Sequence, residues 1–392
     1  MRKMSLFIAV ILYGSAFNSF SAEQASVMPV AFDVAVTSRY YVNRSSALDS
    51  RFSKGFKGEV KASQQRDEQS FSGRIFVNWD TEDNQRRYID VREASFYYQH
   101  EKLRFGLGVD TFFWGVAESI NLVNVLNQSD VMESIDGKVK LGQPFLSLNQ
   151  RYDDGDFSVY FLPIFREQNF PLRPNYGLPI AEQPLYEDGR RRGGIAMRRL
   201  FYFDQGEFAL SYFAGTRRSP LLVQSQLNPQ ELTPYYVQTQ NAMLDGVYLF
   251  ENFTLKLELK VGDEQNSNFT AFNFGVEYPI YDLFEGIEEI TLISEFLFDD
   301  RDAQGENHGQ NDLFIGTKFD FGHSYSSRVR VLYSYDFDFK SQYAEVNYEY
   351  RINDYFRLKS KFIKVLSAPV EDTRLYALKD EQYLKLDLHY AF

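Results

Sequence analysis

The chain has 392 residues, of which 44% are hydrophobic, 17% aromatic and 24% charged, and its formal net charge is −12. This length is sufficient for a large core, whereas an acidic chain without a basic run argues against a nucleic-acid partner. The chain has no cysteine, which excludes disulfides, thiolate metal ligands and a lipid-anchored cysteine after a leader.

The N-terminal segment has the order of a secretory signal. Residues 1–22 begin with two basic residues, continue as the apolar run 6–13 and end in small and polar residues. The apolar run is too short to cross a bilayer as a helix. We therefore expect a signal peptide over residues 1–22 and a single domain over residues 23–392.

Apolar and polar residues alternate with a period of two along most of the remaining chain. In residues 254–261, four aliphatic residues alternate with charged or polar ones. About 18 segments follow this pattern, each close to the roughly 9–11 residues that a tilted membrane strand needs. They are 31–41, 55–65, 70–79, 88–100, 102–110, 144–152, 156–163, 192–203, 206–217, 240–250, 252–262, 268–279, 288–299, 311–321, 326–337, 341–351, 355–366 and 381–392.

The connections between these segments alternate in length. Those after even-numbered strands are short, with 280–287 of moderate length, and those after odd-numbered strands are mostly longer. Outer-membrane barrels have short periplasmic turns and long extracellular loops. The sequence therefore predicts an all-β fold, a transmembrane antiparallel up-and-down β-barrel of about 18 strands (16–20), with both termini periplasmic. The alternative, a soluble β-sandwich of this length, would need two domains, and no linker is visible.

The longest informative loop is 111–143, the third on the side of the long loops. It contains Trp114 and the acidic candidates Glu118, Asp130, Glu133 and Asp136. The loop resembles the third loop of general porins, which folds inward and narrows the pore, and this resemblance implies the same here. The spacing of Ile120, Val123 and Leu126 predicts a short helix inside the lumen. We expect Trp114 either to anchor the loop to the barrel wall or to stack on a solute.

The Trp114-Gly115 element, with Glu118 and the stretch 124–130, also resembles a family of uncharacterised proteobacterial outer-membrane barrels. That resemblance covers about 35 residues and implies no defined substrate.

The polar half of the alternating strands supplies the lumen wall, which carries charges of both signs. A barrel of this size should leave an aqueous channel. The loop acids could face cations of the wall and form a constriction, or the wall charges could only pair with one another. The lumen charge candidates are Arg74, Arg92, Arg104, Asp110, Lys256, Glu258, Arg328 and Arg330.

The last predicted strand ends in Phe392, with Leu388 and Tyr390 at alternate positions before it. This pattern resembles the signal that bacterial outer-membrane insertion machinery reads. The resemblance implies outer-membrane lipids, lipopolysaccharide and the insertion machinery as partners, and location in the outer membrane of a Gram-negative bacterium.

Three functions remain open: a porin-like channel for small polar or charged solutes, a transporter of hydrophobic or amphipathic molecules, and a structural or adhesin-like barrel. No nucleophile elbow or phosphate-binding loop occurs, so we expect no enzyme. We also expect no cofactor and no metal, because the calcium-loop-like segment 300–311 ends in Asn311 where the motif needs Glu. The sequence does not indicate a contact between subunits of an oligomer.

Overall fold

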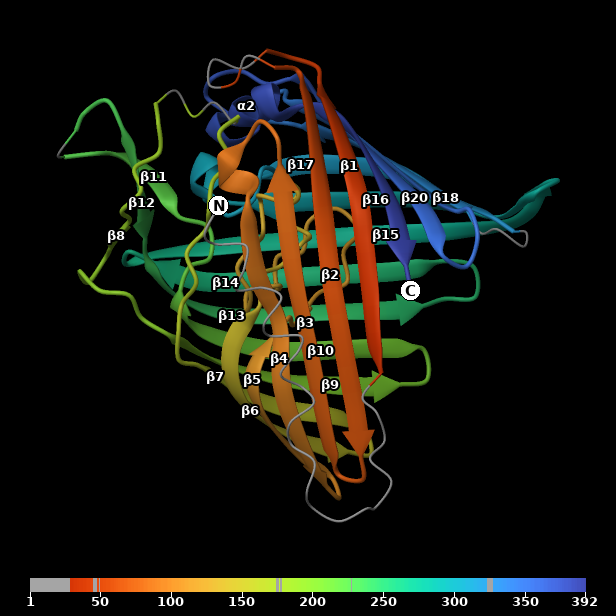
Figure 1. Ribbon diagram of the computed structural model, residues 1–392. Coiled ribbons are helices and arrows are strands. Elements are labelled where there is room, and N and C mark those ends of the chain that lie inside the picture. Colours follow the sequence, from red (N-terminus) through yellow and green to blue (C-terminus); the bar gives the residue numbers. More distant parts are fainter. Residues whose placement is uncertain are drawn as a thin grey trace, which may run out of the picture.

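Eighteen strands form one closed antiparallel sheet in the computed structural model (Figure 1). The structure describes residues 29–44, 48, 50–173, 176, 178–226, 228–322 and 327–392, so the signal-peptide segment lies outside the described residues. The barrel strands are β1 Val30–Tyr41, β2 Phe52–Arg66, β3 Gln69–Asp80, β4 Tyr88–His100, β5 Leu103–Asp110, β6 Gln143–Tyr152, β7 Gly155–Leu162, β9 Gly194–Phe203, β10 Gly206–Thr216, β13 Gln238–Leu249, β14 Thr254–Glu264, β15 Ser267–Phe284, β16 Ile287–Asp299, β17 Asn311–Phe321, β18 Ser327–Asp336, β19 Gln342–Arg351, β20 Phe356–Ser367 and β21 Tyr383–Ala391.

The predicted number of strands and their order are confirmed. Each barrel strand pairs with the strands before and after it, and β1 pairs with β21 to close the ring. No helix among the described residues is long and apolar enough to span a membrane.

One strand is longer than the sequence predicts. β15 continues to Phe284, so the expected connection 280–287 is only a tight turn at residues 285–286, and the β15–β16 hairpin extends well beyond its neighbours (Figure 1). The segment 268–279 predicted from the sequence ends at Pro279, a residue that lacks an N–H group. It is tolerated because β14 stops pairing at Glu277, so Pro279 lies where β15 has a partner on one side only.

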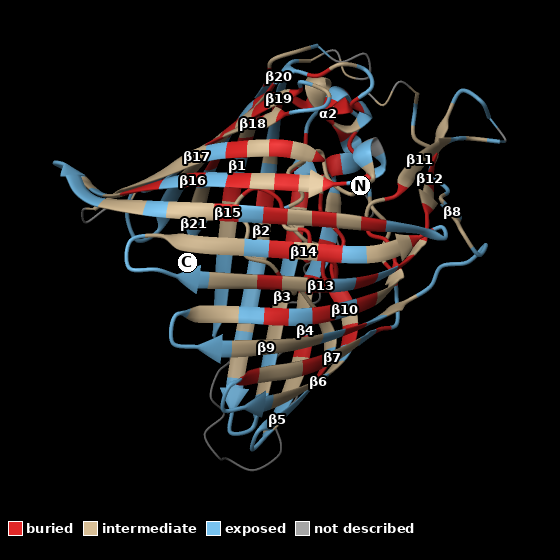
Figure 2. Ribbon diagram, turned by 180° about the vertical axis from the view of Figure 1, so that it is seen from behind, coloured by how far each residue is buried: buried red, intermediate tan, exposed pale blue. Residues whose placement is uncertain are grey.

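The alternation in the sequence places opposite residue types on the two faces of the wall. In β14, Leu257 and Val261 are 38% and 39% exposed on the outer face, whereas Glu258 and Lys260 are 0% and 1% exposed inside. Figure 2 shows the same alternation of buried and exposed residues along the other strands. An apolar outer band around a polar interior is the arrangement that a lipid-embedded barrel requires.

The long connections gather at one end of the barrel, here called the long-loop end, and the tight turns at the other, the short-turn end. The loops carry a small sheet of β8 Leu185–Tyr186, β11 Leu221–Gln224 and β12 Leu232–Tyr236. They also carry the helix α2 Thr373–Ala377 and the 3-10 turns η2 Asn84–Arg86, η3 Asp302–Gln304 and η4 Leu378–Glu381. The loop between β5 and β6, residues 111–142, instead lies inside the barrel, as predicted.

Phe392 lies at the seam where the barrel closes. Its backbone exchanges hydrogen bonds of 2.9 and 3.0 Å with Phe32 of β1, and the two rings stack with centroids 5.1 Å apart. In the register of β21 with β1, Tyr390 faces Val34 and Leu388 faces Val36. These three C-terminal residues therefore belong to the outer face of the seam.

We predict that Phe392→Ala weakens the closure by about 1 kcal/mol, because the ring contact is lost while the backbone pairing remains. The temperature at which the folded band disappears in unboiled gel electrophoresis measures this. Phe250→Ala is the matched control, since it removes a stacked pair (with Phe253, 4.4 Å) away from the seam. Equal shifts for the two variants would contradict a special role of the seam.

Candidate functional site: a loop folded across the barrel lumen

The inward loop, residues 111–142, packs one apolar side against the wall. Trp114, Val123, Val125 and Leu126 are buried with wall residues that include Leu162, Phe213 and Met243. The Trp114 ring lies 5.9 Å from that of Tyr160 in β7, and the Arg198 guanidinium of β9 lies 5.1 Å above it. Trp114 is 6% exposed, so it contacts the wall and leaves little surface for a solute.

Two glutamates of the wall bind the loop backbone. Glu258 of β14 accepts hydrogen bonds from the N–H groups of Val116 (2.7 Å) and Ala117 (2.9 Å) on one oxygen. Its other oxygen accepts from Leu122 (2.6 Å) and Val123 (3.3 Å). Among the described residues no cation pairs with this carboxylate. Backbone N–H groups therefore supply the compensation that a buried charge needs.

Glu295 of β16 binds the intervening residues in the same way. It accepts from the N–H groups of Glu118 (2.7 Å) and Ser119 (2.8 Å) and from the Ser119 hydroxyl. Glu258 and Glu295 together satisfy six backbone N–H groups of the loop. Gly115, at φ +113°, lets the chain approach closely, because a Cβ there would lie 2.7 Å from the Glu258 carboxylate.

The short helix predicted around residues 120–126 is wrong, since residues 111–142 contain no helix. A helix needs its N–H groups to bond carbonyls four residues back. Here the N–H groups of Leu122 and Val123 donate to Glu258 instead. The helix-like spacing has another cause, because Ile120 packs against one part of the wall and Val123 and Leu126 against another; the wall residues are Ala271, Leu297, Phe314 and Leu332 in the first cluster and Leu162, Phe213 and Met243 in the second.

A buried amide residue joins the two ends of the loop. Asn127, 0% exposed, donates to the carbonyls of Asp110 (2.9 Å) and Leu141 (2.8 Å) and accepts from the N–H of Phe112 (2.9 Å). Gln128 donates to the carbonyl of Arg218 (2.8 Å) in the loop before β13. The polar stretch 124–130 therefore has a structural role: it joins the two ends of the inward loop and binds the loop before β13.

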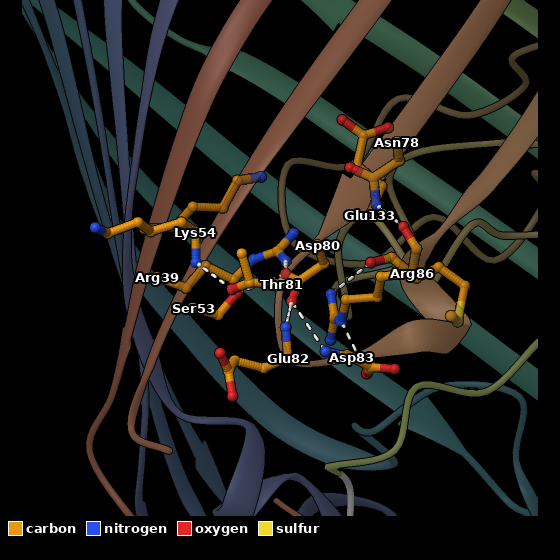
Figure 3. A network of polar contacts seen from close by, with 12 residues as sticks. Arg39, Ser53, Lys54, Asn78, Asp80, Thr81, Glu82, Asp83, Arg86 and Glu133 are labelled. Carbon is orange, nitrogen blue, oxygen red and sulfur yellow. Dashed lines mark hydrogen bonds and ion pairs between the residues drawn. The ribbon is translucent and has the colours of Figure 1, made fainter. Parts of the chain in front are cut away.

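A polar network at the long-loop end holds the far part of the loop (Figure 3). Asp80 accepts from Arg39 (3.0 Å), Ser53 (2.6 Å) and the backbone before η2. Buried Arg86 pairs with Asp83 (3.3 Å), donates to the carbonyl of Met132 in the inward loop and pairs with Glu381 of η4. Arg86 thus ties three loops together.

The acidic loop candidates each contact cations of the wall. Glu118 lies 3.2 Å from Lys256 and 2.8 Å from Lys318. Burial acts to raise the pKa of Glu118, but hydrogen bonds and charge from the two lysines outweigh it and lower the pKa to about 2. Asp136 pairs with Lys361.

Glu133 and Asp130 share Arg92 of β4. Glu133 lies 3.3 Å from Arg92 and 3.1 Å from Lys57 of β2, and Asp130 pairs with Arg92 and accepts from the Tyr88 hydroxyl at 2.6 Å. Burial opposes ionisation of Glu133, yet Lys57, Lys385 and Arg92 lower its pKa to about 2. The ion pairs therefore run from acids of the loop to cations of the wall.

The other wall candidates divide into two groups. Arg74 and Arg330 reach the loop, at the Thr111 hydroxyl (2.7 Å) and the Glu118 carbonyl (3.0 Å). Asp110 accepts from Tyr97 (2.6 Å) at the start of the loop. Arg104 lies 3.9 Å above the Tyr97 ring, and Arg328 pairs with Asp320; neither contacts the loop.

The alternation in the sequence places Glu295 and Lys318 on the lumen face, but neither they nor Lys57 and Lys361 were among the candidates singled out. Glu295 had a usable signal: it is a lone carboxylate between Ile293 and Leu297 on one strand face, all three of them buried. A charge in such a place requires a partner. The lysines had no comparable signal.

At least four cavities lie around the inward loop in the part of the chain that the structure describes. One of about 150 Å³ is lined by the long loops, at Gln168, Arg218 and Glu306. A second, of about 280 Å³, lies along the loop itself. Two more, of about 460 and 340 Å³, are lined by residues of the inward loop, such as Glu133, and by strand residues that include Lys359 and His389. Neighbouring cavities share lining residues, among them Asp136, Lys138 and Lys140. Among the described residues no cluster of His, Asp and Glu is arranged to hold a metal.

We predict that Glu258→Leu and Glu295→Leu release the loop while the barrel persists, because buried N–H groups without a partner cost about 1–3 kcal/mol each. Trypsin should then cut after Lys138 and Lys140. Glu349→Leu is the matched control, a wall carboxylate that pairs with Arg357 and not with the loop. A loop as resistant as in the unaltered protein would contradict the anchoring role.

We also predict that acid loosens the loop only below about pH 4.5. The folded-state pKa values of Glu118 and Glu133 are lowered to about 2 from 4.5. Their ion pairs therefore contribute stability in full above the unfolded-state pKa, and this contribution is lost as the pH falls towards 2. Cleavage by pepsin across pH 2–5 measures this. Release of the loop between pH 5 and 7 would contradict it.

No protein-family model and no curated protein sequence matches the chain. The chain is similar to the crystal structure of Pseudomonas aeruginosa OpdK with vanillate, with a TM-score of 0.52 and 11% identity over 93% of this chain and 98% of that one. It is also similar to Pseudomonas aeruginosa OpdQ, with a TM-score of 0.50 and 9% identity over 93% and 96%. The resemblance to an uncharacterised barrel family gains no support. The chain has the closed β-barrel fold of outer-membrane porins.

Proposed function

We propose that this chain is an outer-membrane channel of porin type, which admits small polar or charged solutes by diffusion. The observation that carries the proposal is the series of four cavities that follows the inward loop from the long-loop end towards the short-turn end. A barrel interior packed only with side chains would leave no such series.

The proposal includes an orientation. The long loops would face the exterior and the tight turns the periplasm, with a signal peptide over residues 1–22 delivering the chain. Both described ends of the barrel, Val30 and Ala391, lie at the short-turn end, which supports periplasmic termini. Lipids and lipopolysaccharide would surround the apolar outer face, and Leu388, Tyr390 and Phe392 would serve the insertion machinery.

The inward loop would set the size limit of the channel. Its ion pairs join opposite charges, so Glu118, Glu133 and Asp136 hold cations of the wall and are not free to bind passing ions. Ion pairs of this kind fix the loop in one position. This supports the view that the loop acids position the constriction and that other groups meet the solute.

Transport of amphipathic molecules stays a second candidate because of one residue. Phe113 of the inward loop is 66% exposed and lines two of the cavities, away from the outer, lipid-facing surface. An apolar ring facing a polar lumen offers a contact for the apolar part of a solute.

We predict steady single-channel conductance in planar bilayers, and a several-fold larger conductance when residues 116–137 are replaced by a short Gly-Ser linker, since the linker removes the constriction. A variant shortened in the residues 228–231 turn, outside the barrel, is the control. If the Gly-Ser linker variant conducts and the unaltered protein does not, the lumen of the unaltered protein is closed. No conductance in either the unaltered protein or the Gly-Ser linker variant would contradict channel function.

A further inference from the structure

Among the described residues, no carboxylate forms an ion pair with two lysines of the inward loop, Lys138 and Lys140. Lys138 donates to the Glu118 carbonyl at 2.7 Å and Lys140 to the Ser129 hydroxyl at 2.9 Å. A third lysine, Lys359 of β20, has no ion pair or hydrogen bond within the part of the chain that the structure describes. The other lumen lysines differ, since Lys57, Lys256, Lys318 and Lys361 each contact at least one carboxylate.

All three unpaired lysines line the cavity of about 460 Å³. Eight cationic side chains line this cavity against three carboxylates, although the whole chain has a net charge of −12. Each of the three carboxylates already has a partner: Asp33 lies 2.7 Å from His389, Glu59 2.7 Å from Lys61, and Glu133 3.1 Å from Lys57. The uncompensated charge in the cavity is therefore positive, and such a field concentrates anions.

Lys140 carries its charge at neutral pH. Burial lowers the pKa of Lys140 to about 8, which still leaves it mostly protonated at pH 7. Burial also lowers the pKa of Lys138, with Arg330 acting in the same direction.

An apolar surface adjoins these cations. The exposed ring of Phe113 lines the cavities of about 460 and 280 Å³, and Lys138 and Lys140 line both as well. Phe76 and Phe112 contribute to the larger one. A cavity of this size holds a small organic molecule, and cations beside an apolar wall suit a molecule with one anionic end and one apolar end.

We propose that Phe113, Lys138 and Lys140 form a binding station for small organic anions that carry a carboxylate on an apolar body, such as a benzoate. The lysines bind the carboxylate and the Phe113 ring packs against the apolar body. Lys359 receives the anion on the side of the short turns. The inference rests on the proposed channel function for access to the lumen, but binding can be measured without flux.

The test is calorimetric titration of the detergent-solubilised full chain with three probes: benzoate, neutral benzamide, and acetate, which lacks the ring. Benzoate should bind at least tenfold more tightly than either. The double variant Lys138→Gln, Lys140→Gln keeps two hydrogen-bond donors, and it should weaken benzoate binding at least tenfold while leaving benzamide unchanged. Phe113→Ala should lower the affinity for benzoate towards the affinity for acetate.

Lys340→Gln is the matched control, because Lys340 is an exposed loop lysine that donates to the Phe337 carbonyl and does not line the cavities around the inward loop. It should bind benzoate as the unaltered protein does, and unboiled gels should show every variant folded. Equal binding of benzoate and benzamide, or unchanged binding in the double variant, overturns the proposal.

Reversal potentials under a potassium benzoate gradient separate this inference from the proposed function. A conductance that prefers anions, with a weaker anion preference in the double variant, supports the binding station. Conductance with cation preference overturns the station and leaves channel function intact. If no current flows, channel function fails, and the calorimetric titration still decides whether the station exists.

Discussion

The arrangement of the lumen depends on one requirement: a loop that enters a barrel must find partners for its backbone N–H groups. A helix satisfies these groups internally and a strand through its neighbours in a sheet, but residues 111–142 form no helix and no strand of the barrel. Glu258 and Glu295 solve the problem from the wall, and together they accept from six N–H groups. The same bonds compensate two buried carboxylates, so loop and wall stabilise each other.

Once the loop is fixed, the charges of the lumen fall into two classes. Wall cations that face Glu118, Glu133 and Asp136 are paired, and their role is to hold the constriction. Lys138 and Lys140 donate only to neutral oxygens, so their charge remains available to a solute. In the cavity of about 460 Å³, counting all lining charges gives both signs, whereas the described charged lining residues without an ion pair are all lysines.

The barrel could be predicted almost completely because a period of two and the spacing of turns are local properties of the chain. The predicted strand 268–279 stops short of Phe284, and Pro279 does not interrupt the observed strand, because a missing N–H matters only where a neighbour needs it and β14 ends before that point. The inward loop was predicted by resemblance, but its conformation was not. Its N–H partners lie about 140 and 177 residues away in sequence. No local pattern reports such contacts, and the helix-like spacing of residues 120–126 pointed to the wrong structure.

Hydrogen exchange of the loop amides tests the central claim most directly. The amides of Val116, Ala117, Leu122 and Val123, together with those of Glu118 and Ser119, should exchange as slowly as amides of the barrel strands, because each donates to a buried carboxylate. Mass spectrometry of the protein in lipid nanodiscs resolves peptides of this length. Exchange of residues 116–123 as fast as that of the 228–231 turn would contradict a loop held across the lumen by Glu258 and Glu295.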